Sequence, residues 1–276
     1  MNYYPLSTDL STRLQDPGKA DPRAGMHPGL VLDRFAAYPD ESFDTFNQER
    51  GQCLHIDVVI AASDAAKAVY GDHLLKQWPR FVGHLPGPPE QWLQSTVWRL
   101  AAHLSRASSL ENGSVCLHPL YGFAYLPGSG LKGLALAQAK LSSTVPSDQE
   151  SIQRIFGAPG HGAGSVIFLD AWPEAWPKLQ RDIVNNHHRH YYERRGKDSP
   201  PGDWESPNPT YFLAVAPGTA FRFAVLSVPA RSAGSNDVHL AKRWLQQGLQ
   251  ELGAGAKTAA GYGYFGEPSE PAGGGL

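Results

Sequence analysis

Residues 236–265 read NDVHLAKRWLQQGLQELGAGAKTAAGYGYF and join a helical pattern to a glycine-rich loop. Apolar residues recur at spacings of three and four in the first half, which predicts a helix with one buried face. These residues are Val238, Ala241, Trp244, Leu245, Leu249 and Leu252. Asn236 is expected to cap the start of this helix and Gly253 to end it. This final helix is the clearest element that the sequence predicts.

The segments upstream predict both helices and strands. Alternation and β-branched residues predict strands at 54–60 and 165–170, and apolar spacing with capping signals predicts helices at 63–78, 89–105, 126–140 and 147–156. Two strand-like runs, 211–216 and 221–228, flank Pro217-Gly218-Thr219, which predicts a hairpin. Because strands and helices alternate without the regular repeat of a doubly wound fold, we expect an α+β fold.

The composition is that of a globular protein, with 276 residues of which 41% are hydrophobic and 18% charged. A formal net charge of −2 excludes a positive field over the whole protein, so any nucleic-acid site has to be local. Two cysteines, Cys53 and Cys116, are too few for a disulfide scaffold. The sequence shows neither a signal-peptide pattern nor an apolar run of membrane-spanning length, so we expect a cytoplasmic protein.

We expect three parts along the chain. Residues 1–50 carry eight acidic and five basic residues and few periodic apolar positions, which predicts an extended N-terminal arm that packs on the core or on a neighbour. Residues 51–265 hold the predicted helices and strands and form the main domain, enlarged by insertions. Residues 266–276 are rich in glycine and proline and are expected to be disordered.

The glycine-rich loop after the final helix has a composition that suits contact with a polyanion. Glycines let a phosphodiester approach backbone N–H groups, while lysine and threonine add a charge and a hydroxyl. The candidate RNA-binding residues here are Gly253, Gly255, Lys257, Thr258, Gly261 and Gly263. A Walker A loop is excluded because Ala256 stands where that motif requires glycine. A plain glycine-rich connection into a last strand remains the alternative, and it would not need Lys257.

A second candidate site is the expected N-terminus of the helix at 126–140. Ser129, Gly130 and Lys132 lie in its first turn, where unpaired N–H donors and the positive end of the helix dipole favour a phosphate. An ordinary serine cap beside a solvated lysine is the alternative interpretation.

Residues 178–197 form a third, basic segment. Six basic residues against two acidic ones give a local charge of +4, and histidines and tyrosines are interleaved with them. Such a mixture suits an RNA strand, and the candidate RNA-binding residues are Arg189, Arg194 and Arg195. A metal site at His187 and His190 and an exposed basic loop remain alternatives.

Several segments in a fixed order make the chain resemble the RAMP superfamily of CRISPR proteins. Within it, the chain is similar to the family of sixth subunits of the Cmr complex of type III-B systems. The matching segments are HPGLVLDRF at 27–35, YGFAYLPGSGLKG at 121–133, GSVIFLDA at 164–171, DIVNNHHRHYY at 182–192, the run at 209–223 and the glycine-rich loop at 253–263.

This resemblance implies a ferredoxin-like, RRM-type core of order βαββαβ with insertions. It also implies a non-catalytic subunit that binds guide RNA near its 3′ end and contacts other RAMP subunits of a Cmr effector complex that acts on target RNA. A different subunit cuts the target in such complexes. We therefore expect no catalytic residue, metal or cofactor and no membrane partner, and the sequence leaves direct contact with target RNA open.

Two other functions remain open. A metal-independent endoribonuclease that processes CRISPR RNA would use His118 near Lys132 and Tyr121, or His187 with Tyr191, as acid and base. A purely structural cap would use tryptophans as interface anchors, with Trp172, Trp176 and Trp204 as candidates. Asp170 and Asp203 are expected to make a strand-end hydrogen bond and a loop cap rather than a metal site.

Overall fold

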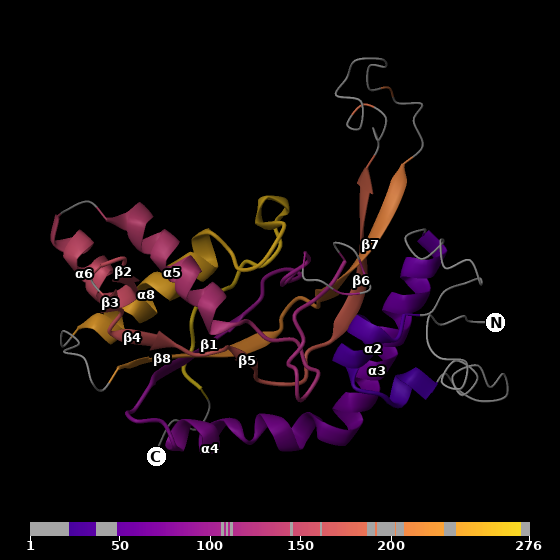
Figure 1. The fold of residues 1–276 in the computed structure, drawn as a ribbon, viewed down its shortest axis with the longest axis horizontal. Coiled ribbons are helices and arrows are strands. Elements are labelled where there is room, and N and C mark those ends of the chain that lie inside the picture. The colour runs from indigo at the N-terminus through magenta and orange to yellow at the C-terminus, as the bar shows by residue number, and fades with distance from the viewer. Residues whose placement is uncertain are drawn as a thin grey trace. The chain divides into compact units, whose positions relative to one another are not determined.

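The computed structural model describes residues 22–36, 49–105, 108, 110, 113–143, 146–160, 162–186, 191, 202, 207–228 and 236–271. The chain divides into two compact units. Unit 1 comprises residues 1–66, 104–115 and 179–214, and unit 2 comprises residues 67–103, 116–178 and 215–276. Helices and antiparallel strands occur in both (Figure 1), which confirms the prediction of an α+β fold.

Unit 2 is built on an antiparallel sheet with β8 (Ala220–Ser227) at its centre. One side of β8 pairs with β1 (Glu90–Ser95), and the other pairs with β4 (Val166–Phe168) and β5 (Trp172–Pro173). Residues after the final helix continue the sheet beyond β1, because Leu93 and Ser269 exchange two backbone hydrogen bonds of 2.8 Å. The expected disorder after Phe265 is therefore wrong for residues 266–271, and residues 272–276 lie outside the described part.

The strand β1 replaces the helix that we expected at 89–105. The expected apolar stripe of that helix included Val97, which is 64% exposed. The buried side chains instead alternate, at Trp92, Gln94 and Thr96, and Trp92 stacks on Phe223 of β8. Gln94 accepts a hydrogen bond from Trp92 Nε1 and donates one to the Gly266 carbonyl. Gln94 and Thr96 can be buried because their polar groups form hydrogen bonds. A pattern that counts only apolar residues therefore does not detect this strand.

Three helices cover one face of this sheet, as Figure 1 shows. They are α5 (Gly128–Ser142), α6 (Pro146–Phe156) and α8 (Asp237–Glu251), and the sequence predicted all three. Helix α8 buries Trp244, Leu245 and Leu249 as expected. A Cβ on Gly248 would lie 3.1 Å from Leu134 Cγ of α5, so α5 and α8 approach each other closely at this glycine.

The start of α8 is held by Asp237 and not by the expected cap. Asn236 makes no capping hydrogen bond with its side chain. Asp237 is 1% exposed and receives hydrogen bonds from the Arg154 guanidinium, the shortest at 2.7 Å, and from Ser165 Oγ at 2.8 Å. The hydrogen bond to this carboxylate raises the pKa of Arg154. The ion pair thus ties α8 to α6 and to the residue before β4.

The opposite face of the sheet is covered by α4 (Trp78–Gly83), whose Trp78 and Val82 pack against Ala224 of β8 (Figure 1). Helix α3 (Glu49–Leu75) precedes it. We expected a strand at 54–60, and this is wrong because the buried residues there follow helical spacing, with Ile56, Val59 and Ala62 in the core. A short run of β-branched residues is compatible with both the two-residue period of a strand and the 3.6-residue period of a helix.

Unit 1 contains the turn η1 (Pro22–Gly25), α2 (Pro28–Arg34) and the first part of α3. The expected arm is thus helical where it is described. His55 of α3 is buried with Nε2 3.3 Å from the Leu32 carbonyl. Burial lowers the pKa of His55 to about 4, and the positive charge of Arg23 acts in the same direction, against the hydrogen bond to Leu32 and the charge of Asp33. The ring is therefore neutral in the folded protein at neutral pH.

Unit 1 also contains a two-stranded antiparallel sheet of β6 (Leu179–Asn186) and β7 (Asn208–Val215). We expected β7 and β8 to form a hairpin, and this is wrong because β7 pairs with β6 while β8 pairs with β1, β4 and β5. The Pro217-Gly218-Thr219 turn is fixed instead by Thr96, whose carbonyl accepts the Gly218 N–H at 2.8 Å. A further short hairpin joins β2 (Gly157–Ala158) to β3 (Gly162–Ala163).

Candidate nucleic-acid interface

The glycine-rich loop leaves the end of α8, shown in yellow in Figure 1, and lies along the segment that follows β1. Three backbone hydrogen bonds join the two: Ala256 N–H to the Ala101 carbonyl at 2.7 Å, Gly263 N–H to the Arg99 carbonyl at 2.9 Å, and Val97 N–H to the Tyr264 carbonyl at 2.8 Å. We call residues 96–103 and 253–265 together the paired surface. It lies entirely within unit 2.

Packing inside the protein explains the glycines of this loop. Gly255 has φ +89°, and a Cβ there would lie 2.6 Å from the Ala101 carbonyl oxygen. Gly263 has φ +74°, and a Cβ there would collide with the Ala254 carbonyl oxygen. Gly253 and Gly261 also have positive φ. The fold therefore needs these glycines whether or not a phosphate approaches them.

Lys257 also has a positive φ, but unlike the glycines it carries a Cβ that makes this conformation unfavourable. Lys257 and His103 have φ of +59°, and they are the non-glycine residues with positive φ among those that the structure describes. A left-handed conformation costs a residue with a Cβ roughly 1–2 kcal/mol. Both residues lie close in sequence to the Ala101–Ala256 bridge that joins the two segments. Strained residues of this kind concentrate at functional sites.

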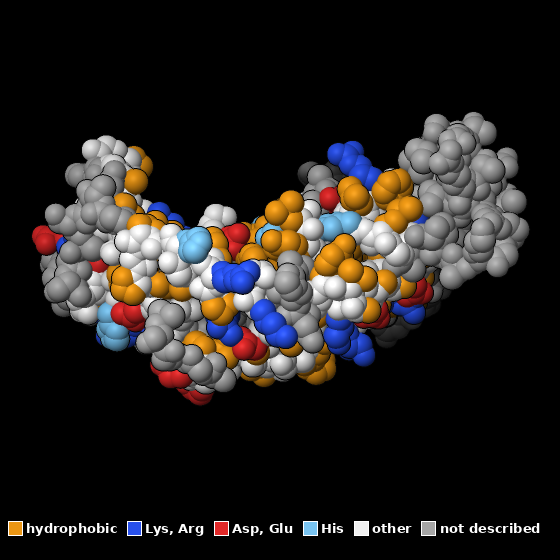
Figure 2. All heavy atoms as spheres, turned by 90° about the horizontal axis from the view of Figure 1, so that it is seen from below, with side chains coloured by type: hydrophobic (Ala, Val, Ile, Leu, Met, Phe, Trp, Pro, Cys, Tyr) orange, Lys and Arg blue, Asp and Glu red, His pale blue; other side chains and the backbone are white. Residues whose placement is uncertain are grey.

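The charges of the paired surface have one sign. Residues 96–103 and 253–265 contain the basic residues Arg99 and Lys257 and no aspartate or glutamate. Figure 2 shows one face of the molecule, on which lysine and arginine side chains stand in separate groups among apolar, polar and acidic ones. The paired surface therefore meets the requirement of a local cationic site in a chain of net charge −2.

The N-terminus of α5 is already capped by a carboxylate. The Gly128 N–H donates to Asp170 Oδ1 at 2.7 Å, which confirms the strand-end hydrogen bond expected of Asp170. Ser129 and Gly130 are exposed and Lys132 is half-buried. Because Asp170 takes one N–H donor and opposes the positive end of the helix dipole, a phosphate would have to approach beside it, at Ser129 and Gly130.

The third predicted segment is only partly described. Arg189, Arg194 and Arg195 lie outside the described residues, as do His187, Asp203 and Trp204. Arg181 of β6 bonds to Asp57 of α3 at 3.0 Å and lies over the Tyr211 ring, 5.5 Å from its centroid. Arg181 thus has partners within unit 1.

His118 lies in a cluster of aromatic rings in unit 2. Its ring stacks on Tyr121 with centroids 4.7 Å apart and contacts Phe123, Tyr125 and Trp172 at 5.1–5.4 Å. Its Nδ1 accepts a hydrogen bond from the Leu120 N–H at 3.3 Å. The structure thus brings together His118 and Tyr121, two of the three residues named for this nuclease alternative, and Trp172 packs on both. No contact of Lys132 with them is seen among the described residues.

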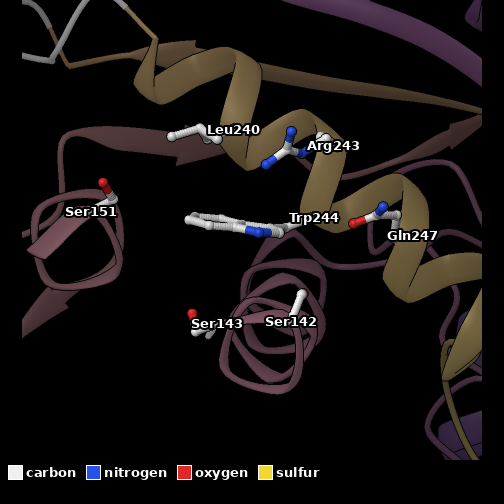
Figure 3. Close-up of a pocket in the computed structure, with 7 residues that line it drawn as sticks. All are labelled: Ser142, Ser143, Ser151, Leu240, Arg243, Trp244 and Gln247. Carbon is white, nitrogen blue, oxygen red and sulfur yellow. The ribbon is translucent and has the colours of Figure 1, made fainter. Parts of the chain in front are cut away.

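A small pocket of about 200 Å³ lies where the end of α5 meets α6 and α8 (Figure 3). It is lined by Ser142, Ser143, Ser151, Leu240, Arg243, Trp244 and Gln247. The hydroxyls of Ser142 and Ser143 donate to the Gln138 and Ala139 carbonyls of α5. This pocket contains none of the predicted site residues, and it lies at the end of α5 opposite to Ser129 and Gly130.

The described part of the chain contains neither a metal-binding cluster nor a membrane-spanning helix. There, no group of three or more His, Cys, Asp and Glu side chains is placed to hold a metal ion. No helix in that part is both long and apolar enough to cross a membrane.

Sequence reasoning missed Trp98 and Arg99. The Trp98 side chain is 47% exposed, and the Arg99 guanidinium lies over its indole ring, 5.1 Å from the centroid. The apolar spacing places their neighbour Val97 on a buried helical stripe, which assigns this segment to the core. The run Val97-Trp98-Arg99 could have indicated an exposed residue. In an extended chain successive side chains point to opposite faces, so the three cannot all be buried on one face.

Comparisons with known proteins identify the family. A model of the RAMP superfamily matches residues 104–266. The CRISPR system Cmr subunit Cmr6 of Pyrococcus furiosus is 38% identical over 128 residues, which make up 43% of this chain and 35% of that protein. The match therefore spans about a third of the length of this curated relative.

One of two similar solved structures supports the fold. A chain in a cryo-EM structure of the type III-B Cmr-beta complex bound to cognate target RNA superposes with a TM-score of 0.56 at 18% identity, over 84% of this chain and 78% of that one. A crystal structure of Cmr6 from Pyrococcus furiosus gives 0.43 at 25% identity, over 65% and 97%. Because the family match covers more than half of the chain, this protein belongs to the RAMP superfamily.

Proposed function

We propose that this protein is a non-catalytic, RNA-binding backbone subunit of a type III-B CRISPR (Cmr) effector complex. It binds guide RNA near the 3′ end and contacts neighbouring RAMP subunits in the assembly that acts on target RNA in the cytoplasm. The observation that carries the proposal is the 38% identity to Cmr6 over 128 residues in a chain that belongs to the RAMP superfamily.

The paired surface supports RNA binding on physical grounds. A subunit that binds any guide sequence has to contact phosphates and sugars while the bases stay available for pairing. Basic side chains provide such contacts, and residues 96–103 and 253–265 contain Arg99 and Lys257 and no aspartate or glutamate. At α5, Ser129, Gly130 and Lys132 would add contacts beside Asp170.

The sheet of unit 2 supports the ferredoxin-like part of the proposal. Its elements follow in the order β1, α5, β4, β8, α8 and the segment 265–269, which is a βαββαβ sequence once α6 and the short strands are taken as insertions. In space the 265–269 segment lies beside β1, β1 beside β8, and β8 beside β4, all antiparallel. Amide exchange checks this: Gly266 and Ser269 should exchange slowly, because both donate to β1 carbonyls.

Purification from the native host tests the whole proposal. A tagged full-length chain should co-purify with RNAs that share a uniform 5′ tag and with several other RAMP proteins. Recovery of the chain alone, free of RNA, would contradict it. RNA–protein crosslinking of the same material separates an RNA-binding subunit from a structural cap, because a cap should give crosslinks to protein only.

The nuclease remains a second candidate because His118 and Tyr121 lie together. Purified chain should leave a guide precursor intact in the presence and absence of a chelator if the proposed non-catalytic role is correct. Chelator-resistant cleavage that is lost in His118→Ala and kept in His84→Ala, a control on an exposed histidine outside the paired surface, would establish the nuclease instead.

A further inference from the structure

Trp98 is the exposed tryptophan of the paired surface. Trp78, Trp92, Trp176 and Trp244 are buried, whereas the Trp98 side chain is 47% exposed. Burial of an indole contributes to the free energy of folding, so a tryptophan that is half exposed contributes less to stability than a buried one. Internal packing therefore gives no reason for an indole at this position.

The indole is held ready for a ligand. Its backbone is fixed, because the flanking Val97 N–H and Arg99 carbonyl are both hydrogen-bonded to the glycine-rich loop. The Arg99 guanidinium lies 5.1 Å from the ring centroid, within range of a cation–π contact. An indole on a hydrogen-bonded backbone, with a guanidinium over the ring and close to half of the residue exposed, is a platform onto which another flat group can stack.

The surroundings favour a nucleobase over a protein side chain. The two segments of the paired surface add the cation of Lys257, whose backbone is left-handed, and contain no aspartate or glutamate. Aromatic rings interleaved with cations are the pattern that binds single-stranded nucleic acid, with the ring stacking on a base and the cations on the phosphates. A protein partner would gain from the exposed ring but would not require that both segments contain basic residues and no aspartate or glutamate.

We propose that Trp98 is the base-stacking residue of the paired surface and holds one unpaired nucleotide of a single-stranded RNA while Lys257 contacts the adjoining backbone. The inference rests on the proposed RNA-binding function and adds the residue and the form of RNA. Stacking is tolerant of sequence because every base has a flat face, which suits a protein that accepts any guide.

Binding of the full chain to a fluorescein-labelled 12-nucleotide single-stranded RNA, measured by anisotropy over a range of salt concentrations, tests this. Trp98→Ala should weaken binding about 5- to 150-fold, as expected for one lost base stack, and leave the salt dependence unchanged since no phosphate contact is lost. Trp98→Tyr should keep most of the affinity. Tyr70→Ala, a change at an exposed aromatic side chain outside the paired surface, should have no effect. The same strand in a duplex should bind more weakly and respond little to Trp98→Ala.

The outcomes separate this inference from the proposed function. Wild-type affinity in a folded Trp98→Ala variant overturns the stacking role and leaves RNA binding standing. A loss that Trp98→Tyr does not restore also overturns it. If Trp98→Ala keeps its RNA but loses co-purifying proteins, the ring belongs to a protein interface and the inference is wrong. If the wild-type chain binds no RNA, alone or in its purified complex, the proposed function fails and the inference fails with it.

Discussion

The start of α5 and the glycine-rich loop look alike in sequence, since each sets glycines beside a lysine, but the structure uses their glycines differently. In the loop, Gly255 and Gly263 lie where a Cβ would meet backbone. In α5 only Gly128 is so placed, against the Phe168 carbonyl, while a Cβ on Gly130 or Gly133 would have open space. A glycine beside a lysine is therefore evidence of a ligand site only where the fold leaves that glycine unexplained. By this criterion Gly130 is a stronger candidate for ligand contact than the loop glycines.

The largest effect should come from filling the loop. Gly263→Ala combines a disfavoured φ with a collision against the Ala254 carbonyl and should destabilise unit 2 by roughly 2–5 kcal/mol. Gly261→Ala is the matched control: its φ is also positive, at +89°, but a Cβ there has no neighbour within 4 Å, so only about 1–2 kcal/mol should be lost. Thermal melting of both variants measures this, and equal losses would contradict the packing explanation.

The next largest effect concerns unit 1. The α5 terminus and the glycine-rich loop both lie in unit 2, so an acid titration that acts on unit 1 should leave them unchanged. His55 has a folded-state pKa of about 4 against an ordinary 6.5, so above pH 6.5 its contribution to stability is complete. As the pH falls from 6.5 to 4 the unfolded chain binds a proton that the folded chain does not. Unit 1 should then lose roughly 3 kcal/mol.

Amide exchange at pH 7.5 and pH 5 should show this loss in the helix around His55. His55→Gln, which can still donate to the Leu32 carbonyl but does not titrate in this range, should remove most of the difference. The glycine-rich loop should keep its protection at both values of pH. Equal loss of protection in the loop would show that another group controls the acid response.

The two α5 glycines should respond with opposite signs. Gly128→Ala should destabilise by about 1–3 kcal/mol because of the Phe168 carbonyl, whereas Gly130→Ala should stabilise the helix by up to about 1 kcal/mol. If RNA approaches the helix N-terminus, Gly130→Ala should nonetheless bind RNA more weakly. Gly133→Ala, one turn further on, is the control and should gain stability without losing affinity. Unchanged affinity in Gly130→Ala would remove the α5 terminus from the interface.

The smallest effect should be on salt dependence. Lys132→Ala and Lys257→Ala should each make the slope of log affinity against log salt shallower by about 0.7, as expected for one phosphate contact with a single strand. Lys140→Ala changes an exposed lysine in the last turn of α5 and should leave the slope unchanged. A slope that stays constant in Lys132→Ala but falls in Lys257→Ala would assign the phosphate contact to the loop alone.

The helices α5, α6 and α8 could be predicted because their signals are local. Each has apolar residues three and four apart, and glycines follow α6 and α8 closely, at Gly157 and Gly253. The candidate residues of the glycine-rich loop could be named from composition for the same reason. The positive φ of Gly253, Gly255, Gly261 and Gly263 agrees with the use of glycine at those positions.

The misassigned elements depend on partners far away in the chain. Strand β1 was missed because Gln94 and Thr96 are buried through hydrogen bonds to Gly266 and Ala216, which lie more than a hundred residues away. The exposure of Trp98 and its place beside the glycine-rich loop follow from the same pairing. These features could not be predicted from the neighbourhood of each residue.

By itself the sequence determined the mixed fold, the helices that cover the sheet of unit 2, and the composition of the two glycine segments, because helical spacing and glycine preference act over a few residues. Only the tertiary structure decided which strands pair, which glycines the fold requires and which aromatic side chain stays exposed beside the cations. Those outcomes depend on backbone hydrogen bonds and close contacts between distant segments, and the free energy of each contact exists only once both segments are in place.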